Sequence, residues 1–295
     1  MSSIQDSQVK YATATDAFLE QQLADLPQLP SQLIDAMRYA LLSQGKRVRP
    51  LLIGLVSEVL DVPLHKALPL MAAIECIHAY SLVHDDLPAM DDDDLRRGQP
   101  TCHKKFPEGI AILVGDALQT MAFDIIMHAE NLDAAKKVRC AKVLTRAAGF
   151  HGMCGGQAID LDATDVSIDL AQLTLLHNLK TGALLNACID FVVELSHDIA
   201  PAHKAALQQY SKAVGLAFQV QDDILDVTSD SVTLGKPSGS DVDLNKSTFP
   251  ALLGLKEAQL YCETLLADAL TACAQLPYNT QGLQDFAKYI IQRKH

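Results

Sequence analysis

Hydrophobic residues recur every three or four positions along most of the chain, which is the spacing of an α-helix. Ala and Leu dominate, and the alternating pattern of a β-strand is scarce. The pattern predicts helices over 33–42, 67–87, 110–129, 134–148, 170–195 and 201–227. Proline lacks an amide proton, so we expect Pro50, Pro69, Pro88 and Pro201 at breaks between helices. No linker rich in Pro, Gly and Ser divides the chain, which favours one all-α domain over 1–295.

Two stretches lack a helical pattern or an apolar face. The N-terminus is polar and mixed, and we expect it to be flexible over about 1–10. The segment at about 228–247 is polar and contains Gly235, Pro237 and Gly239. A loop of this length is typical of a functional lid or of disorder, so we expect it to be mobile.

The helix expected at 70–83 is apolar on nearly every side, which predicts a place at the centre of a bundle. Its few polar residues therefore need a partner or a function. They are Glu75, His78, Tyr80 and Ser81.

Composition narrows the class of protein. Of 295 residues 49% are hydrophobic, which excludes an intrinsically disordered chain. The net charge of -12 argues against nucleic-acid binding, which needs a basic face. We find neither a signal peptide nor a long uncharged apolar run, so we expect no membrane span. Seven cysteines without a CxxC pair suggest buried, reduced thiols and a cytoplasmic protein.

Two acidic clusters follow apolar helices. The first runs from His84 to Asp94, with Asp85 and Asp86 in the last helical turn before Pro88, where the helix dipole disfavours negative charge. In the second, Asp222 and Asp226 share a helix face, again at a local cost. Carboxylates suit Mg²⁺, which keeps waters and prefers substrate phosphates as further ligands. The clusters therefore predict a magnesium–diphosphate site. The alternatives are a solvated acidic surface or an EF-hand, but Leu95 and Arg96 occupy positions where an EF-hand needs a ligand and a glycine.

Basic residues accompany the acids in short motifs at helix ends and loops. They are Gly45-Lys46-Arg47-Val48-Arg49-Pro50, Arg96-Arg97-Gly98, Lys180-Thr181-Gly182, Lys236 and Lys246. If the acidic clusters face each other, six carboxylates meet. Unit charges about 4 Å apart repel by about 4 kcal/mol at an effective dielectric of 20. We therefore expect diphosphate binding to depend on divalent metal, with Arg and Lys gripping the outer phosphate oxygens.

As an ordered set these motifs resemble those of the trans-prenyl diphosphate synthases, and most closely the bacterial farnesyl diphosphate synthases. The resemblance covers nearly the whole chain. It also includes Glu75-Cys-Ile-His-Ala-Tyr80, Gly155-Gly-Gln-Ala-Ile-Asp160, Phe218 through Asp226 and Gly235-Lys-Pro237. It implies the isoprenoid synthase fold, an antiparallel helix bundle around a deep central cavity, usually as a homodimer.

The resemblance also implies site roles. Asp85, Asp86, Asp91, Asp222, Asp223 and Asp226 would serve about three Mg²⁺ ions, with Mn²⁺ as a substitute. Isopentenyl diphosphate would lie on Lys46, Arg49, His78 and Arg97. Allylic diphosphate would lie on Arg96, Lys180, Lys236 and Lys246. Lys180, Thr181 and Gln219 would stabilise the allylic cation. Asp92, Asp93 and Asp94 would be solvated or tied to Arg96 and Arg97, and Gln157 and Asp160 receive no role.

The implied reaction condenses isopentenyl diphosphate with dimethylallyl and then geranyl diphosphate to give farnesyl diphosphate. Tyr80 lies five residues before Asp85, about 7.5 Å deeper in a helix. With Ser81 it would form the floor that limits chain length. A geranyl or geranylgeranyl diphosphate synthase remains an alternative, as does simple packing of Tyr80. The motif at 45–50 and Lys180-Thr181 argue against a terpene cyclase or a head-to-head synthase. A non-catalytic helical partner subunit is the alternative from another class.

Overall fold

The computed structural model describes residues 3–27, 29–43, 45–164, 166–196, 199–228 and 247–293. The helices are α1 (Ile4–Ala24), α2 (Ser31–Leu41), α3 (Val48–Val59), α4 (Leu64–Asp85), α5 (Cys102–Lys105), α6 (Glu108–His128), α7 (Ala134–Ala148), α8 (Met153–Asp162), α9 (Leu170–His177), α10 (Ala183–Leu195), α11 (Pro201–Thr228), α14 (Phe249–Leu253), α15 (Leu255–Ala274) and α16 (Gln281–Gln292). A π-helical turn, η1 (Asn178–Gly182), joins α9 to α10. A small hairpin pairs β1 (Leu95–Arg96) with β2 (Gln99–Pro100). The all-α prediction is confirmed, and α7 has the bounds that its periodicity indicated.

Side-chain caps explain where several helices begin. Asp133 accepts from the amide of Lys136 at 2.8 Å at the start of α7. Ser3 and Asp6 form a capping box at the start of α1. The chain is therefore helical from Ile4, and Ser7 is buried, so the expected flexible segment over 1–10 is wrong for residues 4–10. The loop expected at about 228–247 lies almost wholly outside the described residues.

Two of the prolines do not mark breaks. Pro50 lies in the first turn of α3, where amide protons have no helical partner and a proline costs little. Pro69 lies inside α4 and is buried, so packing of that helix offsets one missing hydrogen bond. The other two behave as expected: α11 begins at Pro201, and α4 ends three residues before Pro88.

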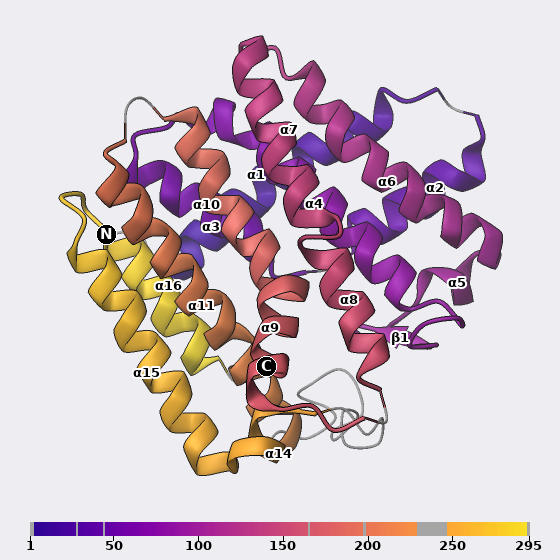
Figure 1. Ribbon diagram of the computed structural model, residues 1–295. Helices are drawn as coiled ribbons and strands as arrows, with labels where there is room; N and C mark the ends of the chain where they lie inside the picture. Colours follow the sequence, from indigo (N-terminus) through magenta and orange to yellow (C-terminus); the bar gives the residue numbers. More distant parts are fainter. Residues whose placement is uncertain are drawn as a thin grey trace.

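Helix α4 lies at the centre of the bundle and packs on α6, α3, α1 and α10 (Figure 1). Thirteen of its residues are buried, because apolar side chains occur on every face. By length and composition alone α4 and α6 could cross a membrane. The apolar window of α4 is 72% buried inside the bundle, as in the core helix of a folded domain, whereas that of α6 is 44% buried. The expectation of no membrane span stays a prediction.

A second, smaller core lies where α9, α11, α14 and α15 meet, around Leu173, Val220 and Phe249. Helix α16 packs on α11 and brings the C-terminal end of the described chain next to the end of α11 (Figure 1). All seven cysteines are free thiols, and six are buried as expected. The expectation is wrong for Cys154 in α8, which is exposed.

Candidate active site

The first acidic cluster forms where α4 ends. Asp85 is the last helical residue and Asp86 the cap, as the position of Pro88 predicts. The following loop turns back, so the amide of Asp91 donates to the carbonyl oxygen of Asp85 at 2.9 Å. This bond closes the loop and returns Asp91 to the end of the helix, so the backbone brings two of the expected metal ligands together.

Asp86 is committed to a cation of the protein itself. It is 3% exposed, and Arg96 on β1 donates to it from Nε at 2.7 Å and from a terminal nitrogen. Burial raises the pKa of Asp86, and the bond from Arg96 opposes that rise. Arg96 also lies 3.6 Å from Asp93. Asp92 and Asp94 instead lie near Lys104, not Arg97, at 3.8 and 2.7 Å.

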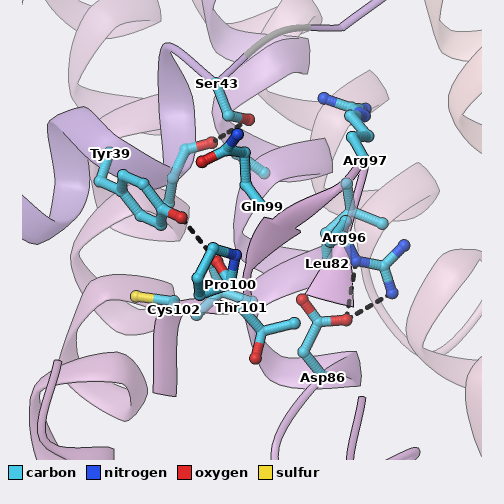
Figure 2. A pocket seen from close by; sticks show the side chains of 13 residues that line it. Tyr39, Ser43, Leu82, Asp86, Arg96, Arg97, Gln99, Pro100, Thr101 and Cys102 are labelled. Carbon is cyan, nitrogen blue, oxygen red and sulfur yellow. Dashed lines mark hydrogen bonds and ion pairs between the residues drawn. The ribbon is translucent and has the colours of Figure 1, made fainter. Parts of the chain in front are cut away.

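The hairpin turn sends two neighbouring arginines in opposite directions. Arg97 and Gly98 both have positive φ, as a two-residue turn of this kind requires. Figure 2 shows Arg96 reaching Asp86 while Arg97 points away from it, beside a cavity of about 50 Å³. Arg97 lies against the backbone of Gly45, where a side chain would meet its guanidinium at 2.6 Å. Glycine at position 45 therefore allows the Arg97 guanidinium to pack against the loop that carries Lys46.

The residues expected to bind isopentenyl diphosphate lie together in one cationic cluster. Burial, then the charges of Arg49 and Arg97, lower the pKa of His78 well below its usual range, so its imidazole is neutral. Burial also lowers the pKa of Arg49 and of Lys46. The Nε atom of Arg49 is buried and has no hydrogen-bond partner among the described residues. An unused buried donor among cations is an anion-binding feature.

Arg47, between these cations in sequence, has a different role. It is 7% exposed, and its guanidinium bonds Asp16 at 2.8 Å, Glu75 at 2.9 Å and the carbonyl of Leu41 at 2.8 Å. Glu75 thus obtains the partner that its burial requires, and this pair is part of the core.

Lys180 connects the first cluster to η1. Its ammonium lies 2.7 Å from Asp160 on α8 and 3.8 Å from Asp85. Asp160, which receives no role from the motifs, is therefore the carboxylate that holds Lys180. Gly156 lies against the backbone of Lys180, where a Cβ would come within 2.2 Å of its amide nitrogen.

A second chain of contacts connects η1 to the second acidic cluster. Thr181 donates to the carbonyl of Gln219 at 3.1 Å, and the Gln219 amide donates to Asp223 at 3.4 Å. The other oxygen of Asp223 accepts from the backbone amide of Phe249 at 2.9 Å. Asp223 and Asp226 are each 3% exposed, whereas the side chain of Asp222 is 41% exposed. Asp222 is therefore the most accessible of the three.

Asp222 already contacts a cation. Arg293, after α16, lies 2.5 Å from it, donates to the carbonyl of Phe218 at 2.8 Å and stacks over that ring at 3.9 Å. The side chain of Arg293 is 6% exposed, and its Nε has no hydrogen-bond partner among the described residues. Its charge also lowers the pKa of Lys46, so the cationic cluster and the second acidic cluster are near each other.

Tyr80 and Ser81 lie on α4 below Asp85. Tyr80 is 6% exposed and packs edge-on to His84 at 5.8 Å. Ser81 donates to the carbonyl of His78 at 2.8 Å, so its hydroxyl is used within the helix. Lys236 and Lys246 lie outside the described residues.

The donor set suits magnesium in complex with a diphosphate. Among the described residues no three His, Cys, Asp or Glu side chains converge into a ready cage. The carboxylates instead lie at two helix ends, and Mg²⁺ takes one or two of them together with phosphates and water. The residues present therefore fit the ion.

Sequence reasoning missed Arg293, Asp160 and the contacts of Tyr80. Arg293 begins the basic run Arg-Lys-His at 293–295, and this run could have indicated a cation for one of the acidic clusters. Asp160 gave none beyond its motif, because only the packing of α8 on η1 brings it to Lys180.

A helical bundle with paired acidic clusters and cations beside them defines a class of metal-assisted diphosphate enzymes. The chain matches the family model described as polyprenyl synthetase over residues 30–276, and it belongs to that family. The resemblance drawn from the motifs is confirmed. A farnesyl diphosphate synthase from Haemophilus influenzae is 46% identical over 283 residues, which cover 96% of each chain.

Solved structures agree in fold. A geranyltransferase from Legionella pneumophila has a TM-score of 0.88 and 36% identity, covering 98% of this chain and 97% of its own. A geranyltransferase from Helicobacter pylori, complexed with magnesium and isoprenyl diphosphate, has a TM-score of 0.83 and 33% identity, covering 98% and 97%.

Proposed function

We propose that the protein condenses isopentenyl diphosphate with dimethylallyl and then geranyl diphosphate to give farnesyl diphosphate. The observation that carries the proposal is the cationic cluster of Lys46, Arg49, His78 and Arg97, which lies beside the two acidic clusters. The buried Nε of Arg49 has no hydrogen-bond partner in the part of the chain that the structure describes, and desolvation disfavours its charge. A bound diphosphate would satisfy both needs. Nearly full-length similarity to a farnesyl diphosphate synthase supports the same reaction.

Magnesium would neutralise the leaving diphosphate when bound. We assign Asp85, Asp91 and Asp222 as ligands of about three ions, for which Mn²⁺ would substitute. Asp86, Asp223 and Asp226 are each 3% exposed, and we assign them to orienting the site. For Asp86 and Asp223 this rests on their bonds to Arg96 and to Gln219 and Phe249.

The remaining side chains divide between the substrates. Lys46, Arg49, His78 and Arg97 would hold isopentenyl diphosphate. Arg96 and Lys180 would grip the allylic diphosphate, together with Lys236 and Lys246. The Lys180 carbonyl, the Thr181 hydroxyl and the Gln219 amide group would face the positive charge that develops as the allylic bond breaks. Apolar walls would keep water from the cation.

Product length would depend on Tyr80, with Ser81 beside it. Tyr80 lies about 7.5 Å below Asp85 along α4, at 1.5 Å per residue, and its ring is buried between neighbours. If the product were geranyl or geranylgeranyl diphosphate, a residue other than Tyr80 would limit the chain length.

We propose that the second copy in a homodimer covers α6 and α7. Leu113 and Met127 on α6 are 49% and 47% exposed and lie nearly four turns apart on one face. Phe150 is 84% exposed beside a hollow lined by Met127, Val138 and Ala141. A projecting ring next to a hollow suits a two-fold contact, in which the Phe150 ring of each copy enters the hollow of the other copy. Sedimentation of Phe150→Asp against wild type tests this, and an unchanged mass would refute it.

We further propose a cytoplasmic location, because all seven cysteines are free thiols, as in a reducing compartment. The net charge of -12 supports small-molecule rather than nucleic-acid partners.

A product assay tests the function. Purified protein receives dimethylallyl and isopentenyl diphosphates with Mg²⁺ or with EDTA, and mass spectrometry sizes the products. We expect farnesyl diphosphate with Mg²⁺ alone. Asp85→Asn should lose at least a hundredfold in rate, because a metal ligand is weakened. Asp92→Asn is the matched control, since the side chain of Asp92 is 60% exposed and lies near Lys104.

Folded protein that gives no condensation with Mg²⁺ would refute the proposal and favour a non-catalytic partner subunit. A product of ten or twenty carbons would keep the enzyme class and move the chain-length limit away from Tyr80.

A further inference from the structure

The phenol group of Tyr80 is held from two other helices. Its oxygen lies 3.9 Å from Sγ of Cys154 on α8. Burial raises the pKa of Tyr80, and the side chain of Gln119 on α6 is close enough to the phenol to oppose that rise. Gln119 and Cys154 are exposed, while Tyr80 is 6% exposed. The ring is thus buried by its own helix and its neighbours, and its polar tip meets two side chains that solvent reaches.

Hydrogen-bond roles follow from the groups present. An amide nitrogen can only donate, so Gln119 donates to the phenol oxygen when its NH₂ faces that atom. The phenol proton is then available for the sulfur of Cys154, a weak acceptor. Both contacts fix the same oxygen, and together they limit rotation of the ring about its own side-chain torsions.

The packing of α4 on α6 makes this position rigid. The imidazole of His84, one turn above Tyr80, contacts the carbonyl oxygen of Ile112 at 3.0 Å. A Cβ on Gly115 would overlap the same ring. Tyr80 and Gln119 meet one turn further along both antiparallel helices. Tyr80 is therefore packed against α6 on one side, and its phenol oxygen faces Cys154 on α8.

We propose that Cys154 and Gln119 are positioning residues for product length, which act by holding Tyr80 as the floor of the prenyl-chain site. This rests on the proposed function. Loss of either contact frees the ring and admits a longer chain. Added bulk on the Cys154 sulfur would occupy the space beside the phenol and stop elongation earlier.

The chain offers a chemical test that needs no new side chain. Cys154 is the one exposed cysteine of seven. Burial raises the pKa of the thiols of the other six cysteines, which keeps them unreactive thiols. Methyl methanethiolsulfonate should therefore transfer its CH₃S group to Cys154, forming a disulfide and releasing methanesulfinate. Dithiothreitol should reverse the change.

The experiment measures the ratio of twenty-, fifteen- and ten-carbon products with Mg²⁺. Cys154→Ala and Gln119→Leu should each raise the twenty-carbon share about fivefold, the ratio that about 1 kcal/mol, one net hydrogen bond, represents. Cys154→Ser, which keeps a hydroxyl partner, should restore the wild-type ratio. Methylthiolated wild-type protein should accumulate the ten-carbon product until dithiothreitol is added. Cys154→Ala should not respond to the reagent, whereas Cys140→Ala, altered at a buried site on α7, should respond as wild type does.

Tyr80→Ala separates this inference from the proposal beneath it. If Tyr80→Ala lengthens the product while Cys154→Ala, Gln119→Leu and methylthiolation leave the ratio unchanged, the support role is refuted and the floor stands. If Tyr80→Ala also leaves the ratio unchanged, the floor itself is refuted, and the role of Cys154 and Gln119 fails with it. Thermal melts of each variant check that the ratio is measured on folded protein.

Discussion

The buried pair Arg47–Glu75 makes a quantitative prediction about stability. The two side chains are 6% and 4% exposed and lie 2.9 Å apart. Arg47→Met removes the cation that hydrogen-bonds to the buried carboxylate of Glu75, and breaking a buried pair in this way typically costs 3–5 kcal/mol. We therefore expect Arg47→Met to lower the free energy of unfolding by about 4 kcal/mol at pH 7.

Urea unfolding of the wild type and the variant at pH 7 measures this loss in the free energy of unfolding.

Two further variants complete the test. Arg47→Met combined with Glu75→Leu should recover most of the loss, since a buried pair replaced by apolar residues is often neutral. Arg38→Met, which breaks the exposed pair with Glu20, should change stability little. A penalty below about 1 kcal/mol would refute the assignment of Arg47 to the core.

Three other changes follow, two from contacts in the site and one from His177, the last residue of α9. Asp160→Asn removes the carboxylate 2.7 Å from Lys180, so the ammonium would pair with Asp85 instead and compete there with Mg²⁺. The Mg²⁺ concentration for half-maximal activity should therefore rise about fivefold. An unchanged concentration would count against competition between Lys180 and Mg²⁺ for Asp85. Burial lowers the pKa of His177 to about 4, below its unfolded value, so its contribution to stability is present above pH 6.5 and is lost as pH falls through 4. The wild type should lose roughly 2 kcal/mol more than His177→Phe between pH 7 and 5 in urea titrations, and equal losses would contradict this. Gly156→Ala should shift the Lys180 backbone and cut kcat at least tenfold in protein that still folds, as circular dichroism would check.

Helices and motifs were predictable here because each rests on local sequence. The period along α7 defines both of its ends, and Pro88 sets the end of α4 within three residues. The spacing between Asp85 and Asp91 likewise works through a local loop, which one backbone bond closes.

Partners across the fold were not predictable in the same way. Arg47 and Arg49 are both cations in one short motif. Nothing in their spacing indicates that Arg47 binds Glu75 in the core, whereas the Nε of Arg49 finds no hydrogen-bond partner within the described ranges. That difference arises from the left-handed backbone of Arg47, whose φ is 45°, and from the helices that close over it. Arg293 lies 71 residues from Asp222, a separation at which no periodic pattern carries information.

The π-helical turn at Asn178–Gly182 sets the rotational phase between two halves of one long helical rod. Before it, α9 buries Leu173 and Leu176 in the smaller core; after it, α10 buries its apolar face in the larger one. A π-turn holds one residue more than an α-turn. Removing a single residue from the turn would restore an unbroken α-helix and rotate one half by roughly 100° against the other. Either the buried apolar face of α9 or α10 would then turn toward solvent, or Lys180 and Thr181 would lose their contacts with Asp160 and Gln219. The π-helical turn should therefore tolerate many substitutions better than the deletion of one residue. A series of single-residue deletions across 170–195 should show its largest loss of activity within this turn.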